Sequence, residues 1–191
     1  AQAAQIKWSP KGDKLLWGKK IWQIGPGKTK PTTTPDSLKE GLVAHYPFNG
    51  RAKNLINGKE ELIPESKIEY SQDGNAAIFN GEKSWLNAPP PAGIIGDSHY
   101  SISVMIKPEQ PAGGLFIFGD HSQPGASISL ILSDGGIKLS GYNENIATGV
   151  KVVAGKWQQL CFSWDGLHYF VSKVDNDGYS ESKHRPVNSS N

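Results

Sequence analysis

The sequence predicts an all-β fold, an antiparallel sandwich of two sheets. Short runs of apolar or alternating residues recur along the chain, separated about every eight to twelve residues by Gly, Pro, Asn and Asp, which is typical of short strands joined by turns. The 191 residues include 22 glycines and 13 prolines. No segment shows a convincing helical period, apart from a single possible turn near residues 36–40. Many short strands are therefore expected in place of long helices.

The clearest strand signal lies in residues 100–106, where apolar and polar side chains alternate with period two. A second strong signal lies in residues 157–164. We expect the apolar positions of these two strands to face the core: Ile102, Val104, Ile106, Leu160 and Phe162. The other predicted strands cover residues 42–48, 76–79, 85–87, 115–118, 127–132, 137–139, 151–153 and 169–174.

The amino-terminal part of the chain differs from the rest. Residues 1–24 contain two short apolar runs around a charged turn, which predicts a β-hairpin extension. Residues 25–40 are rich in Pro, Thr and Gly and predict a linker. The three tryptophans of the extension (Trp8, Trp17 and Trp22) need burial, so we expect the extension to pack on protein, either its own chain or a neighbouring one.

Composition excludes several classes of protein. Twenty Lys and Arg residues against 18 Asp and Glu give a net charge of only +2, which argues against a charge-driven nucleic-acid binder. No run of about 18 apolar residues is present, so no membrane span is expected. The single cysteine, Cys161, cannot form an intrachain disulfide, and we expect it to behave as a small buried hydrophobe. The start Ala1-Gln2-Ala3 fits a chain exported after signal-peptide cleavage, although a trimmed chain would look the same.

Four motifs occur in the order seen in laminin-G-like domains of the concanavalin A-like lectin and glucanase superfamily, which the chain resembles over residues 41–178. The motifs lie in residues 41–50, 75–81, 100–108 and 155–166. The resemblance implies a jelly roll that is secreted or displayed on a cell surface, binds glycan or a protein surface without catalysis, and often holds one calcium ion on its rim. The family usually continues through further strands, whereas residues 179–191 are polar here and predict a tail, so the jelly roll is expected to be incomplete.

Catalysis is not expected. Hydrolases of this superfamily use a Glu-x-Asp-x-x-Glu strand, and no such string occurs. Glu60 and Glu61 are adjacent, so they would point to opposite faces of a strand. No Gly-x-Ser-x-Gly elbow is present, and the five histidines lack the spacing of a zinc helix. A degenerate glycoside hydrolase remains an alternative to a binding module.

Candidate ligand-binding residues come from polar turns. Calcium prefers carboxylate, amide and carbonyl oxygens, and we expect any calcium site to use Asp120 and Asn143, with solvated turns as the alternative interpretation of their loops. Sugars stack on aromatic rings beside polar groups, which singles out Trp85, Tyr142 and Tyr179, together with Asn143.

The sequence also predicts the environment of two tryptophans and of one sheet edge. Trp157 and Trp164 flank an apolar strand and are predicted to lie in the core. An incomplete jelly roll would leave an open edge along residues 42–48, a stretch without charge. The amino-terminal hairpin or a strand from another copy could cover that edge. The second hypothesis is therefore a structural subunit of a cell-surface assembly, a homo-oligomer completed by a neighbouring chain.

Overall fold

A computed structural model of the chain contains most of the predicted strands, in two compact units. One unit combines Ala1–Lys28 with Gly96–Asn191, and the other is Thr29–Ile95. Every regular element in the described ranges is a strand, and none of them contains a helix long and apolar enough to cross a membrane. The described residues are 6–8, 14–17, 20–23, 41–48, 50–51, 53–56, 58, 63–64, 67–72, 76–82, 84–87, 98–110, 112–119, 127–141, 144–175 and 177–185.

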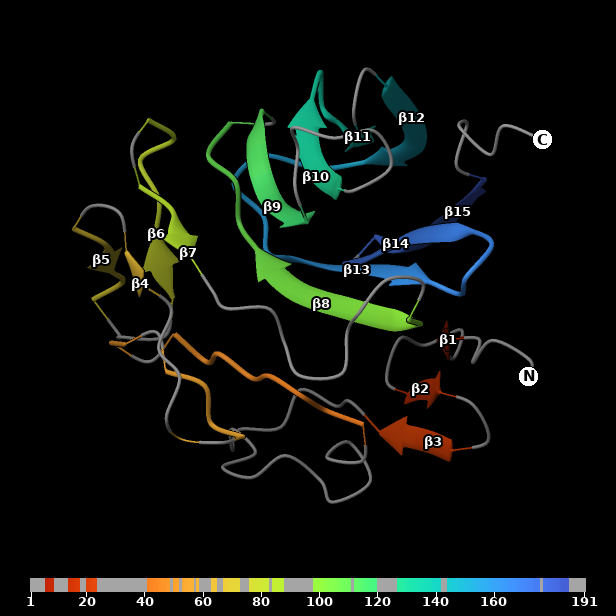
Figure 1. Cartoon of the computed structure of the whole chain (residues 1–191), viewed down its shortest axis with the longest axis horizontal. Helices are drawn as coiled ribbons and strands as arrows, with labels where there is room; N and C mark the ends of the chain where they lie inside the picture. The colour runs from red at the N-terminus through yellow and green to blue at the C-terminus, as the bar shows by residue number, and fades with distance from the viewer. Residues whose placement is uncertain are drawn as a thin grey trace. The chain divides into compact units, whose positions relative to one another are not determined.

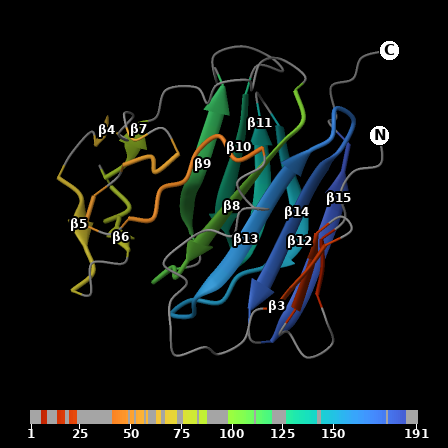
Figure 2. The same ribbon diagram turned by 90° about the horizontal axis from the view of Figure 1, so that it is seen from below.

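The first unit contains two four-stranded antiparallel sheets stacked as a sandwich, which confirms the predicted fold class (Figures 1 and 2). Sheet I has the order β15-β14-β13-β8 and sheet II the order β12-β11-β10-β9. Sheet I consists of β8 (Tyr100–Ile106), β13 (Gln158–Trp164), β14 (Tyr169–Asp175) and β15 (Gly178–His184). Sheet II consists of β9 (Gly113–Gly119), β10 (Ser127–Ser133), β11 (Gly136–Gly141) and β12 (Glu144–Lys151).

The core lies between these sheets and uses one face of each. Leu160 and Phe162 are buried in it, and Ile102, Val104 and Ile106 pack against it, as the alternation in the sequence predicts. The Phe162 ring is central to the sheet I side of this core. Its centroid lies 5.9 Å from the ring of Tyr100, 5.5 Å from that of Phe116 and 5.5 Å from that of Tyr169. Such tilted and stacked ring pairs add to the stability that burial alone provides.

A tight turn connects the two central strands of sheet II. Asp134 and Gly135 form the whole connection between β10 and β11, and both have positive φ angles, 54° and 70°. These angles are typical of a type I′ turn, whose twist matches that of a two-stranded antiparallel ribbon. Lys138 on β11 forms an ion pair with the Asp134 carboxylate at 3.2 Å.

The strand predicted over residues 151–153 is wrong. The strand in this region is β12, which ends at Lys151, so residues 152–153 follow the strand.

The predicted polar tail is wrong for residues 179–184, which form most of β15. This strand pairs with β14 from Asp175↔Gly178 to Tyr169↔His184. Its side chains are almost all polar, so it carries no hydrophobic alternation in the sequence. Pairing of its backbone groups with β14 satisfies their hydrogen-bonding needs without requiring apolar side chains.

The second unit departs most from the expectations. Residues 42–48 were predicted as the first strand, but they belong to no described sheet, so the predicted open edge along them is also wrong. The residues around Asn80-Gly81 do form short strands, which pair with other partners. β4 (Ile63–Pro64) pairs with β7 (Leu86–Asn87), and β5 (Glu69–Tyr70) pairs with β6 (Ala77–Ile78).

The amino-terminal extension is strand-like, with one strand more than the predicted hairpin. β1 (Ile6–Trp8), β2 (Lys14–Trp17) and β3 (Lys20–Gln23) form an antiparallel sheet in the order β1-β2-β3. The predicted linker over residues 25–40 lies outside the described residues, as do residues 186–191 at the end of the predicted tail. The predicted module 41–178 is divided between the two units.

Candidate functional site

The outer face of sheet I, which points away from the core, is defined by strand pairing. Leu160, Phe162 and Val171 point inward and are buried, so their strand neighbours point outward. Pairing aligns these outward side chains in three rows across β8, β13, β14 and β15. The rows are Met105, Gln159, Val174 and Tyr179; Ser103, Cys161, Ser172 and Glu181; and Ser101, Ser163, Phe170 and Lys183.

Hydrogen bonds between strands hold the polar side chains of this outer face in place. Gln159 Nε2 donates to Ser103 Oγ at 3.0 Å, and Ser101 Oγ donates to Ser163 Oγ at 2.9 Å. A hydroxyl group can donate one bond and accept two, so these serines keep hydrogen-bonding capacity for a ligand. The face therefore presents ordered hydroxyl and amide groups.

Large exposed side chains gather at one end of the outer face, where β8 and β14 finish and β13 and β15 begin. Met105 is 57% exposed, Trp157 is 51% exposed and Tyr179 is 39% exposed. Trp157 directly precedes the buried Gln158, so the alternation of β13 places Trp157 on the same side as Gln159. This end of the sheet combines two accessible aromatic rings with the Gln159 amide on β13.

Tyr179 is held by its neighbours on the outer face. Its hydroxyl donates a hydrogen bond to the Glu181 carboxylate. Partial burial and the Glu181 carboxylate both raise the pKa of Tyr179, so the phenol stays protonated through the physiological range. A protonated, hydrogen-bonded phenol keeps its ring in one orientation, which favours stacking on a flat ligand.

Cys161 lies in the middle row of the outer face and is half-buried. Burial raises the pKa of the thiol, and its sulfur lies 3.9 Å from Ser163 Oγ. A thiol with a raised pKa is a poor nucleophile and a poor metal ligand. Cys161 was expected to behave as a small buried hydrophobe, but it lies half-buried on the outer face of the sheet and not in the core.

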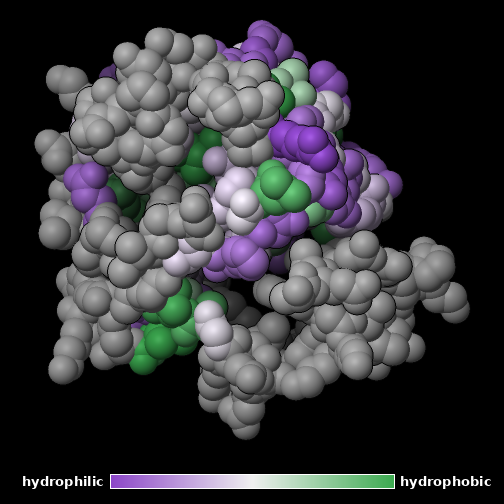
Figure 3. Space-filling view, turned by 45° about the vertical axis from the view of Figure 1, so that its right-hand side comes forward, coloured by the Kyte–Doolittle hydropathy of each residue, from purple (hydrophilic) through white to green (hydrophobic). Residues whose placement is uncertain are grey.

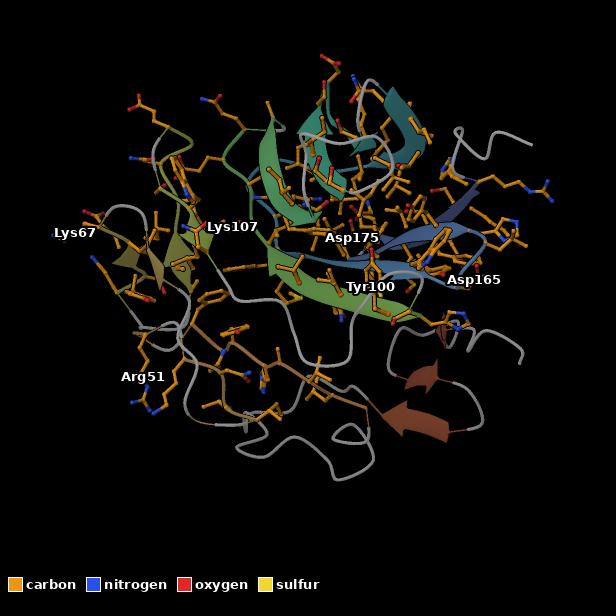
Figure 4. All side chains as sticks on the ribbon, viewed as in Figure 1. Arg51, Lys67, Tyr100, Lys107, Asp165 and Asp175 are labelled. Carbon is orange, nitrogen blue, oxygen red and sulfur yellow. The ribbon has the colours of Figure 1, made fainter. Side chains whose placement is uncertain are left out.

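Charged groups also lie at the opposite end of sheet I. Asp165, in the turn after β13, accepts backbone hydrogen bonds from Leu167 at 2.9 Å and His168 at 2.6 Å (Figure 4). Lys183 lies 5.4 Å above the Phe170 ring, and Arg185 Nε donates to His168 Nε2 at 3.4 Å. Each of these charged side chains therefore already interacts with a neighbouring group of the protein. On the side shown in Figure 3, hydrophilic residues cover much of the described surface, with hydrophobic residues in separate groups.

The structure describes only some of the site residues that the sequence predicts. Tyr179 lies on the outer face, and Trp85 is 46% exposed in the second unit. Tyr142, Asn143 and Asp120 lie outside the described residues. No group of three or more His, Cys, Asp or Glu side chains that could hold a metal ion occurs in the described part of the chain.

Two expectations about individual side chains are revised by the geometry. Trp157 was predicted to lie in the core but is half exposed, whereas Trp164 is half-buried and packs on Tyr169 with 4.5 Å between ring centroids. The exposure of Trp157 could have been predicted from the sequence, because its residue number is odd whereas the inward-facing residues of β13 have even numbers.

The carboxylates of the acidic turn 175–178 form ion pairs. Asp177 pairs with Lys156 at 3.3 Å, and Asp175 pairs with Lys173 at 2.8 Å.

Comparison with known proteins gives one informative match. No family model matches the chain, and no curated protein matches it. Among solved structures, the chain is similar to domain 4 of AbnA, a GH43 extracellular arabinanase from Geobacillus stearothermophilus, in complex with arabinotriose. The TM-score is 0.56, the sequence identity is 26%, and the match covers 75% of each chain. The likeness agrees with a β-sandwich of the jelly-roll type.

Proposed function

We propose that the chain is a noncatalytic, extracellular binding module that recognises oligosaccharides. The observation that carries this proposal is the likeness, over three quarters of both chains, to a domain solved in complex with arabinotriose. That domain belongs to an extracellular enzyme, which supports a location outside the cell. The laminin-G-like motifs of the sequence support the same class of binding module.

The outer face of sheet I offers the chemistry that a sugar needs. A sugar ring has an apolar face, which stacks on aromatic rings, and a rim of hydroxyl groups, which need hydrogen-bonding partners. Trp157 and Tyr179 supply exposed rings. Gln159, Ser103 and Glu181 supply an amide, a hydroxyl and a carboxylate in the two neighbouring rows. Arabinotriose, a short neutral oligosaccharide, is the first ligand to test.

The acidic groups on the outer face favour binding without hydrolysis. Glycoside hydrolysis usually requires two carboxyl groups, about 5–5.5 Å apart in retaining enzymes and about 6.5–9.5 Å apart in inverting enzymes. Among the twelve side chains of the three rows, Glu181 is the single carboxylate, and it already accepts the Tyr179 hydrogen bond. These twelve side chains therefore lack the second carboxyl group that would activate water or attack the sugar.

Calorimetric titration of the whole chain with arabinotriose tests the proposal. We expect Trp157→Ala and Tyr179→Ala each to weaken binding by about tenfold, because each removes one stacking surface. Ile117→Ala is the matched control, since Ile117 is similarly exposed but lies on β9 of sheet II. Absence of binding to arabinotriose and to a panel of neutral plant and bacterial oligosaccharides would contradict the proposal, as would release of shorter sugars.

A further inference from the structure

A small groove in the second unit lies on one side of the β5–β6 ribbon. It has a volume of about 220 Å³ and is lined by Lys67, Glu69, Ile78, Asn80 and Ser84. Glu69 and Ile78 are a cross-strand pair, so they lie side by side on the same face of the ribbon. Lys67 lies beside β5 in Figure 4. The groove therefore has an apolar side chain next to charged and polar groups.

The far side of the groove is fixed by hydrogen bonds within the Asn80 turn. Asn80 N donates to Ser84 Oγ at 2.6 Å, and Ser84 Oγ donates to Asn80 Oδ1 at 2.7 Å. The same Oδ1 accepts hydrogen bonds from the backbone of Glu82 at 3.0 Å and of Ser84 at 3.2 Å. This turn does not need to become ordered when a ligand binds, which reduces the entropic cost of binding.

The side chains of the groove indicate the chemical class of ligand. Lys67 can donate hydrogen bonds and Glu69 can accept them, and their opposite charges leave the groove without a preference for an anion or a cation. Ile78 is half exposed and offers an apolar surface beside Glu69. Pockets for drug-sized ligands have volumes of about 300–1,000 Å³, so this groove suits a smaller unit. Its size and chemistry match one neutral sugar residue.

We propose that this groove is a second sugar-binding site, in a different unit from the outer face of sheet I. The inference rests on the proposed function, because it assumes that the chain binds oligosaccharides. The neighbouring residues support the groove as a ligand surface, since Phe79 and Trp85 flank its polar turn and are about as exposed as Ile78. A chain with two sites binds two molecules of a short oligosaccharide.

Titration of the full chain with arabinotriose, followed by calorimetry and by amide chemical shifts, tests the second site. We expect two molecules bound per chain, with shifts at Glu69 and Ile78 as well as at Gln159 and Tyr179. Glu69→Gln removes a charged acceptor with little change in shape, so it should weaken the groove site by about tenfold and leave the outer-face site unchanged. Glu82→Gln is the matched control, because Glu82 is exposed in the same turn but does not line the groove.

The outcomes separate this inference from the proposed function. If Trp157→Ala weakens the binding reported by the shifts at Gln159 and Tyr179 but not the binding reported by Glu69 and Ile78, the groove binds independently. If the wild-type chain binds one molecule and shows no shift at Glu69 or Ile78, the second site is overturned while the proposed function stands. If arabinotriose does not bind at all, both are overturned for this sugar.

Discussion

Lys173 Nζ lies 2.8 Å from Asp175 Oδ2 on the inner face of β14, and both side chains are nearly buried, with 12% and 3% of their surfaces exposed. Asp175 Oδ1 also accepts a hydrogen bond from the Asp177 backbone at 3.0 Å, in the turn that leads into β15. Asp175 is labelled in Figure 4. The ion pair therefore links the end of β14 to the turn before the edge strand that the sequence did not reveal.

Removing one partner of this pair should destabilise the sandwich strongly. Lys173→Met leaves the Asp175 carboxylate buried without its cation, and such changes typically cost about 3–5 kcal/mol. Urea unfolding followed by tryptophan fluorescence measures the free energy of unfolding. Lys156→Met is the control, because its partner Asp177 is exposed and exposed pairs contribute about 0–1 kcal/mol. Equal losses in the two variants would contradict a buried role for the Lys173–Asp175 pair.

The same pair predicts a pH dependence. Burial tends to raise the pKa of Asp175, but the Lys173 ammonium and the backbone N–H of Asp177 outweigh it and lower the pKa below its ordinary value. A carboxyl group with a lowered pKa stabilises the folded state above its unfolded pKa of about 3.9, and this contribution is lost as pH falls through the lower folded value. The stability difference between the wild type and Asp175→Asn should therefore be constant from about pH 7 to 5 and shrink below about pH 4. A difference that stays constant to pH 2 would contradict this assignment.

The core prediction concerns Phe162, which is 1% exposed. Phe162→Ala removes the ring that contacts Tyr100, Phe116 and Tyr169, and Phe→Ala changes in protein cores cost about 3–5 kcal/mol. Chemical denaturation gives the value directly. Cys161→Ala, one residue along and on the outer face, should cost much less because it leaves the core intact. A loss below about 1 kcal/mol for Phe162→Ala would mean that the core is not centred on this ring.

The sequence predicted the sandwich well where hydrophobic alternation is strong. The sequence predicted both β8 and β13 and which of their side chains face inward, because apolar residues recur at alternate positions in them. β15 was missed because an edge strand can be held by backbone pairing while its side chains are Ser, Glu, Lys and His. The prediction for residues 42–48 was wrong for the opposite reason. Their apolar character suggested a strand, but the structure has no strand there.

The candidate site was predicted only in part. Tyr179 was identified from its polar turn, but Trp157 was assigned to the core, because an aromatic residue beside an apolar strand was taken as buried without counting its parity. The rows of the outer face could not be obtained from the sequence, since they depend on the register between paired strands, with partners as distant in sequence as Tyr100 and Trp164. The same holds for the groove, where Lys67 and Glu69 meet Asn80 and Ser84.

The calcium prediction made from the sequence stays a prediction. Asp120 and Asn143 are expected to supply oxygens if a rim site exists. An ion that binds only to the folded state raises the free energy of unfolding by about 2.7 kcal/mol at a hundredfold excess over its dissociation constant. We therefore expect a higher melting temperature in millimolar calcium than in chelator, and loss of this difference in Asp120→Asn. An unchanged melting temperature in the wild type would contradict a calcium site.

The last prediction concerns Asn54, which is fully buried in the second unit. Its Oδ1 accepts hydrogen bonds from the backbone of His45 at 3.1 Å and of Ile56 at 3.0 Å, and its Nδ2 donates to the Val43 carbonyl at 3.4 Å. Asn54→Leu keeps the size of the side chain but leaves these backbone groups without that partner, at about 1–3 kcal/mol for each buried group. Residues 42–48 belong to no described strand, so strand pairing does not compensate for this loss.

Hydrogen exchange followed by mass spectrometry shows which part of the chain loses stability in Asn54→Leu. In Asn54→Leu we expect faster exchange in peptides covering residues 41–58, and unchanged exchange in peptides covering β13 and β14. Asn87→Leu is the matched control, because Asn87 is exposed on β7 of the same unit. Local acceleration means that the second unit opens independently of the sandwich, as its separate set of contacts suggests. Equal acceleration in both units would mean instead that they unfold as one cooperative body.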